Sequence, residues 1–327
     1  MQLALVGDVM LGRIVNETLR SRTPESAWGD TLPIFHQVDF GMCNLECAIS
    51  DRGEPCALTP KEFHFRSDSK NVRVLRTAGI RAVSLANNHA LDFGYEALSD
   101  TLRSLDKEGI HHAGAGLSSD EASEPAIAQC KGSKIGIVAI TDNQPEWEAR
   151  ENNPGIFYVP IDLRDHRAKK LIDILKRTKT AVDTLIVSAH WGPNWGYEPP
   201  EEHTRFAHSL IDAGADIIFG HSSHVFRGVE IYNRRPILYC TGDFIDDYAV
   251  DAVERNDESF VFVLEKKGAS FSRLRLYPTM IEDCSARLAH VPERYAISEK
   301  MQFLSSKLNA SFLWKEEKGF GYLELDI

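Results

Sequence analysis

This sequence of 327 residues lacks three features, and each absence excludes a class of protein. No two of its cysteines form a C-x-x-C pair, which argues against a disulfide framework or a zinc knuckle. No apolar run is long enough to span a bilayer, and residues 1–6 have neither the basic flank nor the cleavage site of a signal peptide. We therefore expect a soluble, cytoplasmic chain without a transmembrane segment. The six scattered cysteines are Cys43, Cys47, Cys56, Cys130, Cys240 and Cys284.

Long basic runs are also missing. The chain has 48 acidic and 37 basic residues, and its formal net charge is -11. This balance argues against a nucleic acid or an anionic membrane as the partner. A hydrophobic content of 43% over this length is ample for a large core, so the chain can form one large α/β domain or two small ones.

Short apolar runs alternate with stretches of helical spacing, which predicts a layered α/β fold. Two alternating segments, 259–265 and 271–277, are expected to complete a second sheet. Residues 286–327 are expected to form a structural appendage of helix and strand. The runs expected to be buried strands are 3–6, 80–85, 135–140, 184–189 and 216–219, and the expected helices are 14–21, 71–78, 95–108, 163–179 and 204–213.

Polar side chains follow one of these apolar runs directly. The run 80–85 stops at Asn87, Asn88 and His89. Ligands of open α/β sheets bind beyond the carboxyl ends of the strands, so these residues occupy a position suited to chemistry. An amide oxygen can ligate a metal without adding charge, and a neighbouring histidine can transfer a proton near neutral pH. The alternative is structural, with the two asparagines forming a turn that His89 caps.

Two earlier segments end in the same way. Asp8 follows the first apolar run, and the adjacent Gly7 would allow the backbone to approach a bound ion closely. Its structural alternative is a helix N-cap. Asn44 and Glu46 follow a short apolar segment, and strand alternation directs both side chains to one side.

Histidines follow two later runs: His190 after 184–189, and His221 and His224 after 216–219. Asp243 either ligates a metal or orients a ligand histidine, and the second role is favoured because other residues already supply enough donors. Such a mixture of carboxylates and imidazoles suits Mn, Fe or Zn, as one ion or as two ions ~3.5–4 Å apart, and does not suit calcium or an iron–sulfur cluster. The predicted metal ligands are Asp8, Glu46, Asn88, His190, His221 and His224.

The polar segment 49–66 is interpreted as a surface loop that covers the site. Arg66 is the cation within it that we expect to face an anionic substrate. The alternative is a solvated or ion-paired arginine. Asp142 and Asn143 follow the run 135–140 and are candidates for the rim of the site.

At this point the chain resembles the bacterial CapA (PgsA) family, which is linked to capsule and poly-γ-glutamate synthesis and belongs to the calcineurin-like metallophosphatase superfamily. The resemblance covers about residues 1–280. It implies a four-layer α/β/β/α sandwich. We expect residues 1–285 to form the main domain and 286–327 to form an appendage packed on it. The resemblance also implies His89 as the general acid or base, with Asp92 as its orienting partner. The motifs are Gly7-Asp8-Val9-Met10-Leu11-Gly12-Arg13, Asn44-Leu45-Glu46, Asn87-Asn88-His89 with Asp92-Phe93-Gly94, His190-Trp191-Gly192, Gly220-His221-Ser222-Ser223-His224 and Gly242-Asp243-Phe244.

The sequence departs from the superfamily pattern at several positions. Met10 stands where metallophosphatases usually have a histidine, so one of two metal positions is expected to have fewer protein ligands. Ser222 and Ser223 replace a middle histidine and a proline of the family motif, and Asp243 replaces an asparagine. Pro193-Asn194-Trp195 follows His190-Trp191-Gly192 in place of the family's glutamate.

Three functions remain open at this stage. The first is metal-assisted hydrolysis of a phosphoester or of a γ-glutamyl or peptide-type substrate, with His89, Asp92 and Arg66 as the catalytic residues. The second is epimerisation of a peptide residue, because a metal that polarises a carbonyl also acidifies the adjacent Cα–H. The third is a non-catalytic, metal-stabilised factor for capsule polymer assembly. The expected partner is an anionic small molecule, a peptide or polyglutamate.

Overall fold

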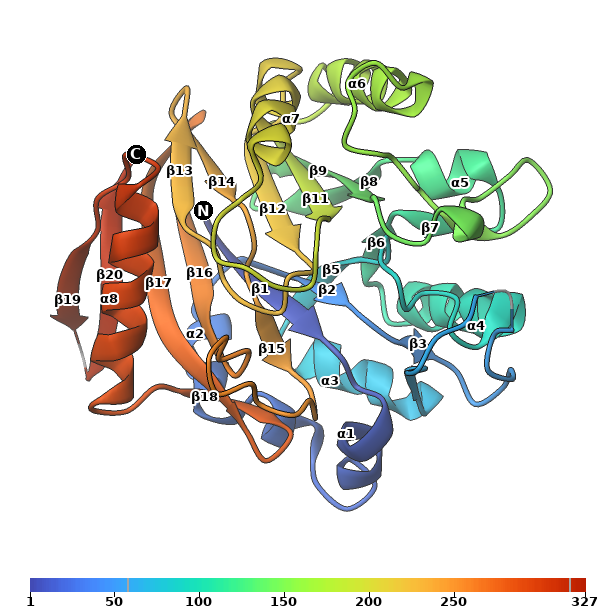
Figure 1. Ribbon diagram of the computed structural model, residues 1–327, viewed down its shortest axis with the longest axis horizontal. Helices are drawn as coiled ribbons and strands as arrows, with labels where there is room; N and C mark the ends of the chain where they lie inside the picture. Colours follow the sequence, from blue (N-terminus) through green and yellow to red (C-terminus); the bar gives the residue numbers. More distant parts are fainter. Residues whose placement is uncertain (58, 318) are drawn as a thin grey trace.

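Two β-sheets face each other, and helices cover their outer faces (Figure 1). The computed structural model describes residues 1–57, 59–317 and 319–327. Residue 58, which falls within the loop predicted at 49–66, and residue 318 lie outside the described part. The layers form an α/β/β/α sandwich, which confirms the expected four-layer fold class.

The larger sheet has ten strands and combines parallel and antiparallel pairs. β1, β2, β5 and β6 are parallel neighbours, whereas β16 is antiparallel to β1, and β17 is antiparallel to both β16 and β20. β15 pairs with the end of β1, and β18 pairs with β17. The order along the main path is β19 (Leu313–Glu317), β20 (Phe320–Asp326), β17 (Ser270–Glu282), β16 (Glu258–Lys267), β1 (Gln2–Val9), β2 (Phe40–Leu45), β5 (Ile80–Ser84) and β6 (His111–Ala113), with β15 (Asp243–Ile245) and β18 (Ser285–Leu288) beside it.

The second sheet has six strands, and its central strands β9, β11, β12 and β14 are all parallel. Two short pairs complete the strand set: β3 (Ala48–Ile49) with β4 (Arg66–Ser67), and β7 (Ala115–Gly116) with β10 (Gly155–Ile156). The order of the six strands is β13 (Val229–Tyr232), β14 (Arg235–Leu238), β12 (Ile217–His221), β11 (Thr184–His190), β9 (Ser133–Thr141) and β8 (Ala126–Cys130).

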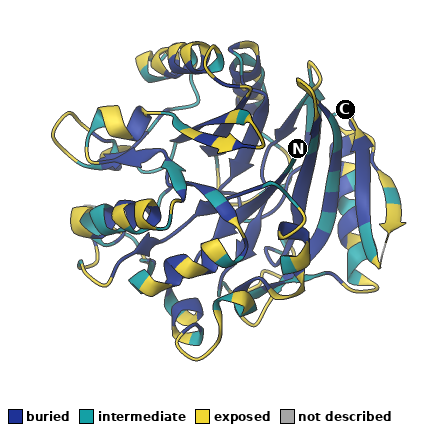
Figure 2. Cartoon of the chain, turned by 180° about the vertical axis from the view of Figure 1, so that it is seen from behind, coloured by how far each residue is buried: buried dark blue, intermediate teal, exposed yellow. Residues whose placement is uncertain are grey.

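Side-chain alternation along the strands produces the layers. Leu3 and Leu5 of β1 face the second sheet and join the core between the sheets. Ala4 and Val6 face the opposite side and pack under helices. The strands are accordingly buried along most of their length, while the helices expose one face (Figure 2).

The helices divide between the two outer faces. α2, α3 and α4 contribute apolar side chains to the core outside the ten-stranded sheet, and α6 and α7 to the core outside the six-stranded sheet. α8 instead places Ile297, Met301 and Leu304 in the core between the sheets. The helices are α1 (Arg13–Thr18), α2 (Leu32–Phe35), α3 (Val72–Thr77), α4 (Gly94–Lys107), α5 (Ser119–Ser123), α6 (His166–Lys179), α7 (Glu201–Asp212) and α8 (Glu293–Ser306).

The arrangement of residues 259–327 differs from the sequence-based expectation. The strands expected at 259–265 and 271–277 are β16 and β17, and they belong to the same sheet as β1; the prediction that they complete the second sheet was wrong. Local alternation fixes a strand but not its pairing partner, because pairing depends on contacts distant in the sequence. Residues 286–327 also extend this sheet, since β20 pairs with β17.

One helix begins later than its apolar spacing indicates. α6 starts at His166 rather than at 163, because the Asp165 side chain accepts a hydrogen bond of 2.8 Å from Arg167 N and caps the helix. Within the described residues, no helix combines the length and apolar composition that crossing a membrane requires.

Candidate metal centre

The first strand delivers Asp8 to a crowded junction between β1, β2 and β15. A Cβ added at Gly7 would lie 1.7 Å from Gly242 O, so only glycine allows β1 and β15 to approach this closely. Asp8 N donates a hydrogen bond of 3.0 Å to Gly242 O, and Asp8 and Asp243 are register partners. The close approach that Gly7 permits is therefore to the backbone of β15. Asp8 does not cap α1, whose N-cap is Gly12.

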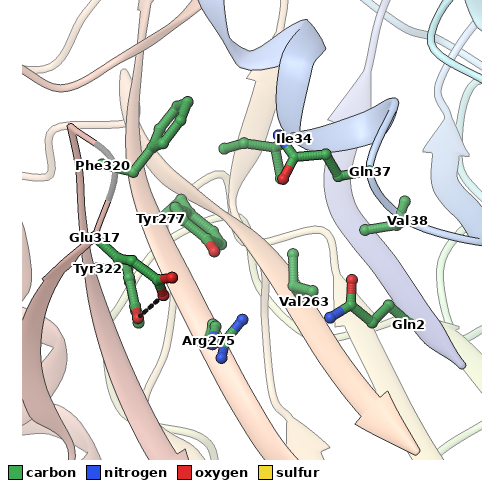
Figure 3. A pocket seen from close by; sticks show the side chains of 10 residues that line it. All are labelled: Gln2, Ile34, Gln37, Val38, Val263, Arg275, Tyr277, Glu317, Phe320 and Tyr322. Carbon is green, nitrogen blue, oxygen red and sulfur yellow. Dashed lines mark hydrogen bonds between the residues drawn. The ribbon is translucent and has the colours of Figure 1, made fainter.

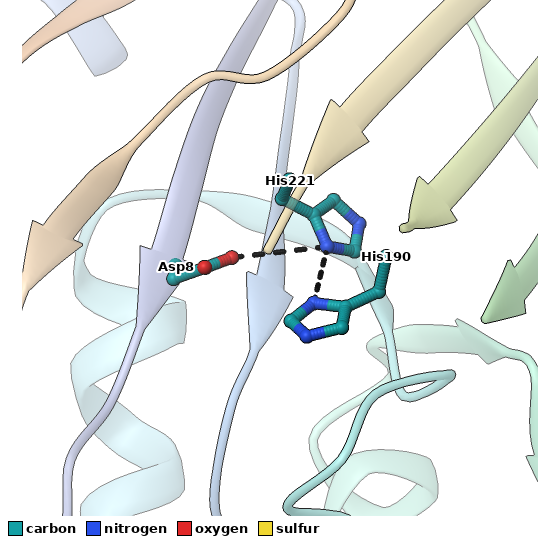
Figure 4. Close-up of side chains that lie close together, drawn as sticks. All are labelled: Asp8, His190 and His221. Atoms are coloured by element: carbon teal, nitrogen blue, oxygen red, sulfur yellow. Dashed lines mark hydrogen bonds and ion pairs between the residues drawn. The ribbon is translucent and has the colours of Figure 1, made fainter. Parts of the chain in front are cut away.

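Asp8, His190 and His221 form one group of potential metal ligands (Figure 4). They come from the ends of β1, β11 and β12, and all three are buried. His190 Nδ1 lies 2.8 Å from His221 Nδ1, and His221 Nδ1 lies 3.8 Å from Asp8 Oδ1. On its other side, His221 Nε2 lies 2.8 Å from Ser188 Oγ. When Ser188 accepts that hydrogen bond, His221 Nδ1 keeps a lone pair that faces the group.

Asp8, His224 and Asp243 form a second group that shares Asp8 with the first. His224 Nδ1 lies 2.9 Å from Asp243 Oδ1. The loop that supplies His221 and His224 has unusual backbone angles, with φ of +106° at Ser222 and +55° at His224. Left-handed conformations at residues other than glycine cost free energy and occur preferentially at functional sites.

Two asparagines fix the orientation of the first group. Asn44 Nδ2 donates to Asp8 Oδ1 at 2.8 Å and lies 3.5 Å from His190 Nδ1. Asn87 Nδ2 donates to Asn44 Oδ1 at 3.0 Å, and Asn87 Oδ1 accepts from His89 N at 3.0 Å. These two side chains thus connect the ends of β2 and β5 by hydrogen bonds, and neither belongs to the predicted set of metal ligands.

The remaining donors have buried oxygens without a partner. Among the described residues, Asp8 Oδ2, both carboxylate oxygens of Glu46 and Asn88 Oδ1 are buried and make no hydrogen bond. Burial raises the pKa of Asp8 and, together with the charge of Asp8, raises the pKa of Glu46 well above its usual value. A bound cation would compensate these buried oxygens, and carboxylate, amide and imidazole groups are the ligands that Mn, Fe and Zn accept. The residues therefore fit a divalent metal.

The histidines are neutral in this environment. Burial lowers the pKa of His221 to about 3 and the pKa of His190 well below its usual value. Burial also lowers the pKa of His224. A neutral imidazole has a free lone pair, which is the form that binds a metal.

His89 lies beside this cluster and faces two acidic residues. Its Nδ1 lies 2.5 Å from Asp92 Oδ2, and its Nε2 lies 3.7 Å from Glu46 Oε1. The ring stacks on Phe65 with a centroid separation of 4.0 Å. Burial lowers the pKa of His89 to about 4, so the imidazole is neutral at pH 7 with its orientation fixed by Asp92.

Lys61, in the loop predicted to cover the site, contacts both His89 and Asp92. Its Nζ donates to Asp92 Oδ1 at 2.6 Å and also bonds to Asn88 O, and it lies 3.1 Å from His89 Nδ1. Asp92 Oδ2 also accepts from Phe65 N at 2.7 Å. Sequence reasoning missed Lys61, because nothing in the sequence of this polar segment indicates which side chain points inward.

A cavity of about 440 Å³ opens beside the donor cluster. Asn88, His89 and His224 line it, so it contacts both the candidate ligands and the candidate acid or base. Tyr248 also lines it, and the buried Tyr248 hydroxyl has no hydrogen-bond partner among the residues that the structure describes. Tyr248 follows Gly242-Asp243-Phe244 by only four residues, which was the available signal for a site residue that the prediction missed.

Arg66, which we expected to face the substrate, does not line this cavity. Its Nη1 donates to the carbonyl oxygens of Arg52 at 3.0 Å and Gly53 at 2.7 Å, and its guanidinium lies 4.4 Å from the centre of the Phe93 ring. It is not among the residues that line the cavity. The cationic residues that do line it are Arg13 and Lys61.

Asp142 and Asn143, the predicted rim residues, contact the backbone around His190. Asp142 Oδ1 accepts from Gly192 N at 3.0 Å, and Asn143 Nδ2 lies 3.4 Å from both His190 O and Ser222 Oγ. Burial raises the pKa of Asp142 to about 6. These contacts fix the backbone that presents His190.

A second cavity, of about 250 Å³, lies on the outer side of the ten-stranded sheet (Figure 3). Tyr277, Tyr322 and Phe320 form its aromatic part, with Arg275 beside them. It contains none of the predicted site residues, so the donor cluster and the chemistry it indicates belong to the first cavity.

The order of the motifs and the converging donors agree with a family match. The family described as bacterial capsule synthesis protein PGA_cap matches residues 2–248. This chain belongs to that family. The matched range includes every predicted ligand and Tyr248, and it ends before β16. The resemblance inferred from the motifs is therefore confirmed.

Individual relatives share much of the chain. A probable polyglutamine synthesis accessory protein of Mycobacterium tuberculosis is 38% identical over 228 residues, which are 68% of this chain and 60% of the relative. This chain thus matches less than two thirds of that relative's length. The PGA biosynthesis protein CapA of Bacillus subtilis is 28% identical over 325 residues, covering 99% of this chain and 82% of the relative.

A solved structure supports the architecture. A hypothetical protein from Thermus thermophilus has a TM-score of 0.51 to this chain at 15% identity, and the match covers 85% of this chain and 98% of that protein. At this level of identity, the likeness concerns the fold alone.

Proposed function

We propose that this PGA_cap member is a metal-dependent hydrolase that acts on an anionic phosphoester or γ-glutamyl substrate in capsule or polyglutamate synthesis. The observation that carries the proposal is the convergence of two donor groups on one carboxylate, that of Asp8, beside an open cavity. The names of the relatives from Mycobacterium and Bacillus support the polyglutamate setting.

In the proposal, Asp8, His190 and His221 hold one divalent ion. His224 and Asp243, sharing Asp8, hold a second ion or orient the first. Glu46 and Asn88 contribute the buried oxygens that lack a partner. A divalent ion in such a site lowers the pKa of a bound water toward ~7 and polarises a substrate carbonyl or phosphoryl oxygen.

The chain's own residues supply the proton transfer. His89 Nδ1 donates to Asp92, which leaves Nε2 as the atom that accepts or returns a proton. Asp92 is fixed by Lys61 and by Phe65 N, so the imidazole cannot rotate freely. The Tyr248 hydroxyl is an unused donor at the cavity, and burial together with neighbouring carboxylates raises the pKa of this phenol well above its usual value. It therefore stays protonated and can donate a hydrogen bond to a substrate oxygen.

The proposal is tested with the chain loaded with Mn²⁺. p-Nitrophenyl phosphate and γ-glutamyl-p-nitroanilide are assayed in parallel, and deuterium incorporation at Cα is followed in a γ-glutamyl peptide. We expect release of p-nitrophenol or p-nitroaniline that requires the metal. Exchange at Cα without hydrolysis would replace the proposal with epimerisation. Neither reaction, in a chain that binds metal, would leave a non-catalytic assembly factor.

A further inference from the structure

Arg13 lies at the cavity but has no part in the chemistry described so far. It ends the first motif, Gly7-Asp8-Val9-Met10-Leu11-Gly12-Arg13, and it lines the same cavity as Asn88 and His89. We propose that Arg13 forms a recognition subsite for a carboxylate on the substrate, separate from the group that reacts. This proposal rests on the proposed function, because it concerns the substrate of the same cavity.

The backbone of Arg13 is held in an unfavourable conformation. Its φ is +49°, in the left-handed region that non-glycine residues rarely adopt. Asp247 stabilises the turn, because its Oδ2 accepts a hydrogen bond of 2.8 Å from Ile14 N and lies 3.3 Å from Arg13 Nε. The Asp247 side chain is only 1% exposed, so the anchor is rigid. Backbone strain of this kind occurs preferentially at functional sites, where it fixes the direction of a side chain.

Two aromatic rings border the guanidinium. Its central carbon lies 5.1 Å from the centre of the Phe63 ring and 5.7 Å from that of the Phe65 ring. Cation–π contacts of this kind hold the planar group in place without using its N–H donors. Phe65 also stacks on His89, so one aromatic side chain connects the proposed subsite to the candidate acid or base.

The terminal nitrogens of Arg13 remain available. Within the described part of the chain, neither Nη1 nor Nη2 of Arg13 makes a hydrogen bond, whereas Nε faces Asp247. Lys61, the other cation of the cavity, already donates to Asp92. In a chain with net charge -11, a guanidinium at the cavity that pairs with Asp247 through Nε alone is therefore the group best placed to attract an anion.

The chemistry of the subsite favours a carboxylate on a short aliphatic stem. A guanidinium edge matches a planar carboxylate with two parallel hydrogen bonds. Phe63 and Trp195, which line the same cavity as Arg13, are 50% and 43% exposed. Their rings offer apolar surface for the methylene groups of a substrate. A glutamyl residue joined through its side chain has this form, because its α-carboxylate stays free while its γ-carbonyl reacts.

Binding measurements test the subsite without requiring turnover. Isothermal titration of the Mn²⁺-loaded chain is performed with tri-γ-glutamate, with the same peptide amidated at every α-carboxylate, and with inorganic phosphate. We expect Arg13→Gln to weaken tri-γ-glutamate binding by about tenfold or more, as the loss of a charge-assisted pair implies. The amidated peptide should bind weakly to both proteins, and phosphate affinity should be unchanged.

Arg20→Gln is the matched control, because it removes the same charge from an exposed position next to α1 that does not line the cavity. Arg13→Lys should recover only part of the affinity, since an ammonium cannot form the bidentate pair. Equal weakening by Arg13→Gln and Arg20→Gln would overturn the proposal, as would weakening by Arg66→Gln alone.

Two further outcomes would also overturn the subsite. One is a wild-type chain that does not bind tri-γ-glutamate, and the other is a loss of phosphate affinity in Arg13→Gln in place of peptide affinity. Peptide binding that depends on Arg13, in a chain that hydrolyses neither the peptide nor p-nitrophenyl phosphate, would reject the hydrolase while supporting the subsite. The two proposals can therefore fail separately.

Discussion

His190 Nδ1 and His221 Nδ1 face each other at 2.8 Å across the neighbouring parallel strands β11 and β12. Burial keeps both imidazoles neutral, so at most one proton lies between two nitrogen lone pairs. With Asp8 directed at the same point, this arrangement is suited to a shared positive ion.

Replacing His190 by Ala is expected to remove tightly bound metal. One nitrogen donor is lost, and affinity should fall by at least the ~10–100-fold that follows loss of an outer partner of a metal ligand. Metal content measured by mass spectrometry after dialysis tests this expectation. His166→Ala is the control, because the His166 side chain is 85% exposed and remote from the donor groups. Equal metal content in both variants would contradict the assignment.

Replacing His89 by Gln is expected to lower kcat by ~10²–10⁴-fold, because general acid–base catalysis typically contributes this much. KM and metal content should change little, since His89 belongs to neither donor group. Steady-state kinetics with the better of the two chromogenic substrates measures the effect. His112→Gln, at a histidine that pairs with Asp106, should leave kcat unchanged. An unaltered kcat in His89→Gln would exclude the proton-transfer role.

Tyr248→Phe removes only the unpartnered hydroxyl at the cavity. We expect kcat to fall by about tenfold or more while the melting temperature stays the same or rises, because the hydroxyl makes no hydrogen bond within the described part of the chain. Kinetics and thermal unfolding of the same preparation separate the two effects. A large loss of stability with unchanged kcat would show that the hydroxyl has a structural role.

The strand ends were predictable because their signal is local. His190, His221 and Asp8 each follow a short buried run, and parallel strands place such positions at one edge of a sheet. The side chains of the loop at 49–66 had no such local sequence signal. Lys61 reaches Asp92 only through the path of its loop, and in the same loop Arg66 does not reach the cavity, which Arg13 of α1 lines instead.

Long-range pairing was the other part that sequence could not supply. The alternation within β16 and β17 predicts strands, but β16 pairs with β1 across more than two hundred residues of chain. Neither alternation nor turn residues encode such a partner. For the same reason, the pairing of β20 with β17 could not be read from the composition of residues 286–327.

Gly7→Ala is expected to destabilise the fold by about 2–4 kcal/mol, the range of severe backbone or packing conflicts. The added methyl group would overlap Gly242 O, which belongs to the backbone and cannot move without displacing β15. Gly79→Ala is the comparison, because its φ of +67° is strained but its Cβ position is open; a cost of about 1 kcal/mol is expected there. Urea unfolding measures both, and equal costs would show that the close approach of β1 to β15 is unimportant.

The pair between Glu293 and Arg287 predicts a pH-dependent contribution to stability. Two hydrogen bonds of 2.8 and 2.9 Å from Arg287 lower the pKa of Glu293 to about 2, against ~4.3 in the unfolded chain. The pair therefore stabilises the fold above pH ~4.3, and this stabilisation is lost as the pH falls toward 2. Glu293→Gln should cost about 1 kcal/mol at pH 7, because the Glu293 side chain is 33% exposed and screened.

Urea unfolding at a series of pH values measures this effect. The difference between wild type and Glu293→Gln should shrink as the pH falls from 5 toward 2. Glu299→Gln, on the exposed side of the same helix, provides the control curve. A difference that stays constant over this pH range would mean that the ion pair is not its source.

The position of β20 has a consequence for biosynthesis. β1 is synthesised long before β16, β17 and β20, yet all four strands belong to one sheet, and β20 lies at residues 320–326. Until these residues have been translated, β17 presents an open edge, and open edges invite intermolecular association. The sheet is therefore incomplete until late in translation, and its exposed strand edge can associate with other chains during that time. We expect chaperones to bind the nascent chain while this edge is exposed.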